Sequence, residues 1–188
     1  VMKFGGTSVG KPERMHAVAQ LINRDTESKI VVLSALSGTT NALVSIGEAL
    51  ASGDRELAKQ HIDKLEAHYQ QFIRELVKTE KAYQRSRSIV AEHFEFLHII
   101  LKISFSDALS KDILAQGELL STKLFCAYLE EAGVDHVLLP ALEFMLIDSN
   151  DEPVLPAIKK RLGEALKSHP GKKLFITQGY ICRNMRGE

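Results

Sequence analysis

The chain has 188 residues, in which 24 Lys and Arg residues balance 24 Asp and Glu residues, and 45% of the residues are hydrophobic. This composition is typical of a folded globular protein and excludes a disordered chain or a coiled rod. The even charge argues against non-specific nucleic-acid binding, which requires a basic surface. It leaves room for a local basic site that binds one phosphorylated ligand.

The cellular compartment is predicted from what the sequence lacks. The longest strongly apolar stretch, Phe94–Phe105, is too short to span a membrane, and no cleavable apolar leader opens the chain. The two cysteines, Cys126 and Cys182, lie in unrelated segments and predict neither a disulfide framework nor a metal knuckle. We therefore expect a protein of the reduced cytoplasm.

The N-terminal segment predicts a strand, a loop, a helix and a second strand. Val1–Phe4 is short and apolar and stops at two glycines, and Pro12 then opens a segment with apolar residues at helical spacing. Ile30–Leu33 is a continuous aliphatic run, which is typical of a strand covered on both faces. A strand–helix–strand unit predicts a right-handed crossover and a parallel sheet, so the expected fold class is α/β.

The middle of the chain predicts helices. A small polar loop, Ser34–Asn41, precedes a helix expected over residues 42–51. Residues 54–105 contain two apolar stripes at steps of three and four, which predict two helices packed as a hairpin. Another helix is expected over residues 110–132, with Gly133 as its C-terminal stop.

The C-terminal segment mixes short strands with one helix. Strands are expected over residues 137–139, 144–147 and 174–177, and a helix over residues 156–166. The seven histidines show no metal-ligand spacing, and we interpret them as solvated helix positions.

Three loops follow the expected strands that end near Phe4, Leu33 and Thr177. These loops are expected to meet at the carboxyl edge of the sheet, where open α/β sheets bind ligands. The first loop, Lys3–Ser8, contains Gly5 and Gly6, which let backbone amides approach an anion closely. Lys3 adds a point charge that could stabilise a transferring phosphoryl group. The alternative is a simple turn beside a surface lysine.

A near match to the phosphate-binding loop lies in the same segment. Gly5, Gly10 and Lys11 have the spacing of Gly-x-x-x-x-Gly-Lys-[Ser/Thr], but Pro12 replaces the hydroxyl residue that would ligate magnesium, and proline offers no N–H. We therefore reject this motif and assign the phosphate charge to Lys3.

Two further segments offer ligand contacts. The hydroxyls and the amide of Ser34–Asn41 could bind a small ligand, although a glycine-containing turn explains them as well. Gly117 sits inside an apolar helix at a cost of about 1 kcal/mol relative to Ala, which indicates close backbone approach at this point. Its neighbour Glu118 could pair with a substrate ammonium, and the alternative is a solvent-facing Glu beside a packing glycine.

Taken together, four segments in order resemble the aspartokinases of the amino-acid-kinase superfamily, and the resemblance covers essentially the whole chain. The four segments are Lys3–Val9, Val32–Asn41, Gly117–Ser121 and Thr177–Ile181. In the last of these, Tyr180 stands where a Phe is more usual in the family.

This resemblance implies a three-layer α/β/α sandwich of the carbamate-kinase-like type, with a mostly parallel central sheet. It implies transfer of the ATP γ-phosphate to the β-carboxylate of L-aspartate, giving 4-phospho-L-aspartate on the route to lysine, threonine and methionine. Magnesium would be held mainly by phosphates, with no metal on protein ligands. By the same resemblance, Lys3 is the catalytic residue, the ATP-binding residues are Lys3, Phe4, Gly5 and Gly6, and the aspartate-binding residues are Thr40, Glu118 and Tyr180.

The resemblance also implies that residues 1–188 form the N-terminal portion of one amino-acid-kinase domain, with a helical insertion at about 54–105. The family continues into a Gly-Arg-Gly-Gly-Ser-Asp segment, a nucleotide-binding C-terminal half and regulatory ACT domains, which this sequence does not include. We therefore expect a homo-oligomeric, allosteric parent enzyme and no turnover by the 188 residues alone.

Two other interpretations stay open. The chain could belong to another amino-acid kinase, acting on glutamate, acetylglutamate or a nucleotide, although the Ser-Gly-Thr-Thr-Asn loop and the long helical region favour aspartate. It could instead be a non-catalytic module in which the hairpin Glu56–Leu101 mediates self-association or regulatory contacts.

Overall fold

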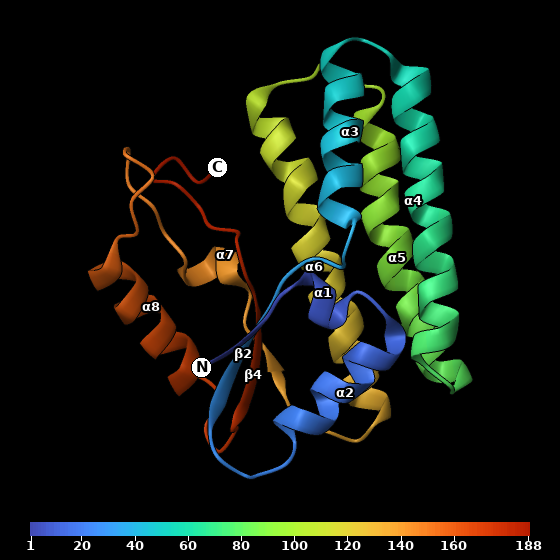
Figure 1. Cartoon of the computed structure of the whole chain (residues 1–188). Coiled ribbons are helices and arrows are strands. Elements are labelled where there is room, and N and C mark those ends of the chain that lie inside the picture. The colour runs from blue at the N-terminus through green and yellow to red at the C-terminus, as the bar shows by residue number, and fades with distance from the viewer.

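The computed structural model describes residues 1–188 and contains a four-stranded sheet in the order β1-β2-β4-β3 (Figure 1). Every pairing between neighbouring strands is parallel, which confirms the predicted α/β class. The strands are β1 (Met2–Phe4), β2 (Lys29–Leu33), β3 (Val137–Leu138) and β4 (Leu174–Gln178).

Eight helices surround this sheet, and several begin at residues suited to the role. Pro12 stands in the first turn of α2, where its missing N–H costs nothing. The side chains of Asp54, Thr79 and Ser106 accept hydrogen bonds from backbone amides in the first turns of α4, α5 and α6. None of the helices combines the length and apolar character that a bilayer span requires. The helices are α1 (Gly6–Val9), α2 (Pro12–Ile22), α3 (Thr39–Ala51), α4 (Arg55–Leu76), α5 (Glu80–Ile100), α6 (Asp107–Glu131), α7 (Ala141–Phe144) and α8 (Leu155–Lys167).

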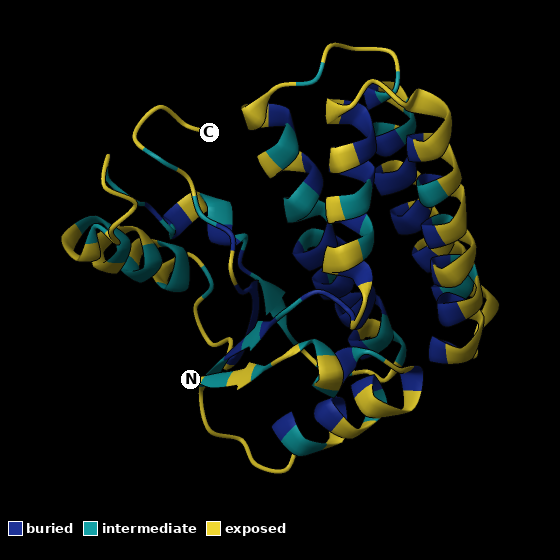
Figure 2. Ribbon diagram, turned by 45° about the horizontal axis from the view of Figure 1, so that its top comes forward, coloured by how far each residue is buried: buried dark blue, intermediate teal, exposed yellow.

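The main core lies between one face of the sheet and the long helices. Its 36 buried residues form one cluster that includes the apolar stripes of α4 and α5, so the predicted helical hairpin is confirmed. Figure 2 shows the buried residues concentrated where these helices face one another. Each fully buried Leu or Ile in such a core contributes about 1.5–3 kcal/mol.

The opposite face of the sheet is covered more thinly. A cluster of five buried residues, among them Phe144 and Phe175, packs there with partly buried residues of α8. No residue of α8 is fully buried. In β2, Val31 and Leu33 are buried, whereas Ile30 and Val32 are only half-buried. The expectation that Ile30–Leu33 is covered on both faces is therefore wrong, since only one face of β2 is fully buried. In contrast, β4 is buried throughout.

The strand expected over residues 144–147 is wrong. Pro140 precedes a short helix, α7, and Phe144 ends it with its side chain buried in the smaller core cluster. Only isolated bridges follow, between Leu146 and Arg183 and between Ile147 and Pro153. Backbone hydrogen bonds join Met145, Leu146 and Ile147 to Arg183 and Val154, but they do not extend into a strand.

Some helix boundaries also differ from the expectation. The third helix begins at Thr39 because Gly38 takes a left-handed φ of 85° and ends the loop. The sixth begins at Asp107, where the Ser106 hydroxyl caps it. The single-turn helix α1 directly after the first strand was not expected.

The interpretation of the histidines as solvated helix positions is wrong for His136 and His169, which lie outside the helices, and for His93. The His93 side chain is buried between α5 and α6, and its Nδ1 lies 2.6 Å from Oε1 of Gln116. Burial lowers the pKa of His93, because the protonated ring would be poorly solvated there.

Candidate functional site

The candidate site is a cavity of about 310 Å³ at the carboxyl edge of the sheet. The segments that follow β1, β2 and β4 all reach it, as the predicted topology requires. It brings together five of the predicted site residues from four separate parts of the chain. Its lining consists of Lys3, Gly6, Ser34, Ala35, Leu36, Thr40, Glu118 and Tyr180.

Lys3 enters this cavity because of the alternation of side chains along β1. Met2 and Phe4 pack against the main core, so Lys3 between them points to the opposite side of the strand and stays exposed. Lys11 is exposed at the start of α2 and does not line the cavity. The structure thus places the two candidate lysines in different surroundings.

The glycines of the first loop differ in what surrounds them. A Cβ on Gly6 would lie 2.8 Å from the carbonyl oxygen of Ala35, and one on Gly10 would lie 2.7 Å from Cβ of Ser37. Both glycines therefore allow the first loop to pack against the loop after β2. A Cβ on Gly5 would have no neighbour within 4 Å, and neither Gly5 nor Phe4 lines the cavity.

Glu118 lies at the inner wall of the cavity, with only 6% of its surface exposed. Its Oε1 accepts a hydrogen bond from the backbone amide of Ala35 at 3.3 Å. Burial raises the pKa of Glu118 above its ordinary value, because the charged carboxylate is poorly solvated there. The alternative of a solvent-facing Glu is therefore wrong.

The backbone of α6 approaches the loop after β2 very closely. A Cβ on Gly117 would lie 2.8 Å from Cβ of Ala35, which agrees with the close approach inferred from the sequence. One turn later, the Ser121 hydroxyl donates a hydrogen bond to the carbonyl of Ser34 at 2.7 Å. These contacts hold Glu118 and the loop in one rigid unit.

Thr40 and Tyr180 complete the opening of the cavity. Thr40 is exposed in the first turn of α3. Tyr180 is 90% exposed and has a positive φ of 65°, a conformation that costs a non-glycine residue about 1–2 kcal/mol. It also lines a neighbouring cavity of about 390 Å³ beside α6, so this residue borders both cavities.

The sequence analysis missed the apolar part of this wall. Ala35 and Leu36 are both buried and line the cavity, although only the hydroxyls and the amide of their loop were considered as ligand contacts. Their position directly after a buried strand was the available signal. The structure contains no group of three or more His, Cys, Asp or Glu side chains arranged to hold a metal ion.

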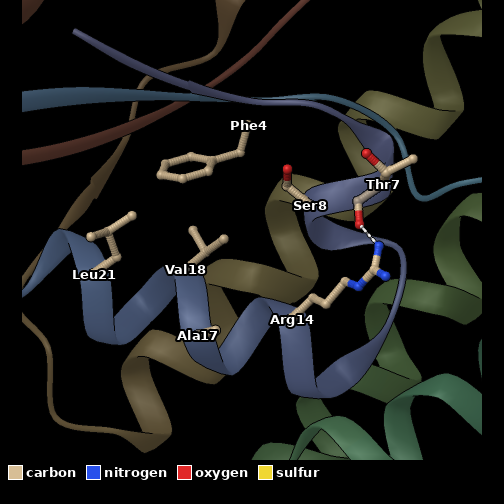
Figure 3. Close-up of a pocket in the computed structure, with 7 residues that line it drawn as sticks. All are labelled: Phe4, Thr7, Ser8, Arg14, Ala17, Val18 and Leu21. Atoms are coloured by element: carbon tan, nitrogen blue, oxygen red, sulfur yellow. Dashed lines mark hydrogen bonds between the residues drawn. The ribbon is translucent and has the colours of Figure 1, made fainter.

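A second cavity, of about 380 Å³, lies beside the first loop (Figure 3). The Phe4 ring faces Val18 and Leu21 of α2 across it, and the Arg14 guanidinium donates a hydrogen bond to the Thr7 carbonyl. Its lining contains no carboxylate, and its one cationic group is already engaged. We therefore place the candidate site in the first cavity, which both Lys3 and Glu118 line.

Comparisons with known proteins identify the family of this chain and several relatives. The model of the amino acid kinase family matches residues 1–188. The chain is 37% identical over 202 residues to aspartokinase 3, chloroplastic, of Arabidopsis thaliana, covering 99% of this chain. It is 31% identical over 194 residues to the lysine-sensitive aspartokinase 3 of Escherichia coli, covering all of this chain.

Solved structures of aspartokinases have a similar fold. The fold superposes with a TM-score of 0.81 on E. coli aspartokinase III in complex with lysine and aspartate, at 26% identity. The same TM-score, at 27% identity, is found with that enzyme in complex with aspartate and ADP. Both comparisons cover 100% of this chain and 42% of the other. The chain spans 34% and 41% of the length of the two curated relatives above.

Proposed function

Since this chain belongs to the amino acid kinase family, we propose that it forms the substrate and phosphoryl-transfer part of an aspartate kinase. The reaction is transfer of the ATP γ-phosphate to the β-carboxylate of L-aspartate, which yields 4-phospho-L-aspartate. The names of the relatives support aspartate over glutamate, acetylglutamate or a nucleotide as the acceptor.

One observation carries the proposal: a single cavity contains an exposed lysine, a glycine turn, a threonine hydroxyl and a buried carboxylate. These groups match the charges of the reactants. Lys3 would neutralise charge on the transferring phosphoryl group, and Gly6 would let backbone amides approach it. Thr40 and Tyr180 would contact aspartate, and Glu118 would bind its ammonium group.

The proposed reaction requires little covalent help from the protein. The β-carboxylate of aspartate is itself a nucleophile, so no general base is needed. Positioning and charge neutralisation are the main requirements of phosphoryl transfer. In this proposal Lys3 neutralises charge, and the contacts between α6 and the loop after β2, which hold the cavity wall, support positioning.

The nucleotide would be bound as its magnesium complex. The one carboxylate of the cavity, Glu118, already accepts a hydrogen bond from Ala35. This donor set suits a metal ion held mainly by phosphate oxygens, with Lys3 and the backbone of Gly5 and Gly6 near the phosphates. When bound, magnesium neutralises phosphate charge.

The proposal assigns the remaining nucleotide contacts to sequence outside these 188 residues. Relatives are more than twice as long, and the cavity itself contains no arginine to pair with the substrate carboxylate. We expect the purified 188-residue chain to form no aspartyl phosphate. A homo-oligomeric parent and a cytoplasmic location stay predictions.

The decisive experiment compares two lysine substitutions in the full-length gene product. We expect Lys3→Ala to lower kcat by at least about 100-fold, because a charge aimed at the transferring group is lost. Lys11→Ala serves as the matched control and should change kcat by less than about threefold, because this side chain lies outside the cavity.

The measurement is a coupled assay for ADP release with aspartate as acceptor. A severe loss with Lys11→Ala and a mild one with Lys3→Ala would reinstate the phosphate-loop motif and refute the proposal. Activity with glutamate or acetylglutamate in place of aspartate would retain the reaction class and overturn the substrate.

A further inference from the structure

The residue before Thr40 makes a contact that reaches far outside the cavity. Thr39 is the first residue of α3, and only 2% of its surface is exposed. Its Oγ1 lies 2.9 Å from the phenol oxygen of Tyr69, which belongs to α4 in the helical hairpin. A buried side-chain hydrogen bond therefore joins the hairpin to the helical turn that presents Thr40.

The start of α3 has no side-chain cap. Its N-cap residue is Gly38, which has no side chain to bond the free amides of the first turn. Thr39 fixes this turn from two sides. Its methyl group faces Gly117 of α6, since Cγ2 lies 3.4 Å from the position of a Cβ there, and its hydroxyl meets Tyr69.

Tyr69 is itself rigidly seated. It is fully buried, and its ring centroid lies 6.4 Å from that of Phe72 and 5.9 Å from that of Phe94. These aromatic neighbours come from both helices of the hairpin. The phenol can therefore act as a fixed point against which Thr39 is placed.

We infer that Tyr69 is a positioning residue for the acceptor side of the cavity: through Thr39 it sets the place of Thr40. The helical hairpin is then part of the substrate site rather than a peripheral insertion. The inference rests on the proposed function for its kinetic consequence, but its structural part stands on the Thr39–Tyr69 contact alone.

The kinetic test is Tyr69→Phe in the full-length gene product. The substitution keeps the ring and leaves the Thr39 hydroxyl buried without its partner, which loosens the first turn of α3. We expect the KM for aspartate to rise about 3- to 10-fold, with the KM for ATP unchanged and kcat within about twofold.

Tyr83→Phe is the matched control. Tyr83 lies on α5 of the same hairpin and packs against the same core, but no hydrogen bond of its phenol connects it to the cavity. The same chemical change there should leave all three kinetic constants unaltered. Equal effects of Tyr69→Phe and Tyr83→Phe would overturn the inference.

Substitutions of Thr39 separate its hydroxyl from its methyl group. Thr39→Val should reproduce the rise in KM. Thr39→Ser keeps the hydroxyl and loses only the methyl contact, so it should raise the KM less than Thr39→Val. Since Tyr69→Phe and Thr39→Val remove the same contact, the double variant Tyr69→Phe/Thr39→Val should bind aspartate no worse than the weaker single variant. Additive effects would contradict the proposed link.

Hydrogen exchange of the 188-residue chain tests the link without catalysis. The amides of Thr39 and Ala42 donate to the carbonyls of Leu36 and Gly38, respectively. They should exchange several-fold faster in Tyr69→Phe than in Tyr83→Phe. Unchanged exchange would refute the inference. Faster exchange, together with a full-length gene product that shows no aspartate-dependent activity, would refute only the proposed function.

Discussion

At the scale of single residues, Glu118 shows how burial changes the chemistry of a common side chain. Helix α6 places this carboxyl at the inner wall of the cavity, where one backbone amide is its hydrogen-bond partner. A carboxylate in such a position is poorly solvated, and a nearby cation would stabilise it. The ammonium group of an amino-acid substrate would supply one.

The raised pKa of Glu118 predicts how stability depends on pH. A carboxyl that binds its proton more tightly in the folded chain favours folding at low pH, and this stabilisation is lost as the pH rises above its ordinary value of 4.5. Glu118→Gln removes this titration and keeps an oxygen for the amide of Ala35. The variant should therefore gain stability relative to the wild type as the pH rises.

Urea unfolding at about pH 4.5 and about pH 7 measures this difference. The free energy of unfolding of the wild type, minus that of Glu118→Gln, should become more negative between the two conditions. A constant difference would mean that the carboxyl titrates normally in the folded chain.

At the scale of secondary-structure elements, α6 is the helix that assembles the cavity. Gly117 brings its backbone against the loop after β2, and Glu118 and Ser121 hydrogen-bond to that loop. The intrinsic cost of a glycine within a helix is thus offset by contacts that no larger residue would permit.

Two glycine-to-alanine substitutions test this explanation. Gly117→Ala should destabilise the chain by about 1–3 kcal/mol, because the added methyl would overlap Ala35. Gly163→Ala, inside α8, has nothing within 4 Å and should stabilise by about 0.5–1 kcal/mol through helix propensity. Chemical denaturation checks both, and the same sign for the two changes would contradict the packing argument.

At the scale of the whole molecule, the two faces of the sheet are unequal. The core of 36 buried residues lies between one face of the sheet and the helices α2, α3, α4, α5 and α6. The cluster on the other face of the sheet has only five buried residues. Figure 2 shows α8 with exposed and half-buried residues along its length. The layer that contains α8 should therefore be the less stable part of the molecule.

Native-state hydrogen exchange tests this inequality. The amides of α8 should exchange through local opening, at a free energy several kcal/mol below that of β4 and the centre of α6. This difference should appear in residue-resolved exchange rates at low denaturant. Equal protection of α8 and β4 would show that the chain opens only as one unit.

Much of this molecule follows from local sequence patterns. The parallel strands, the helical hairpin and the meeting of the glycine loop with the Ser34–Asn41 loop were predicted, because apolar periodicity and the placement of Gly and Pro act within a few residues. The role of each side chain in the cavity stays a prediction, since residue type and place do not by themselves determine chemistry.

Other features depended on contacts between distant segments and were decided only by the tertiary structure. The amide of Ala35 meets Glu118 across 83 positions, and Thr39 meets Tyr69 across 30. The short helix that replaced the expected strand at Phe144 is likewise a result of packing. Burial and hydrogen-bond partners of this kind arise from the folded arrangement as a whole, so local propensity alone does not reveal them.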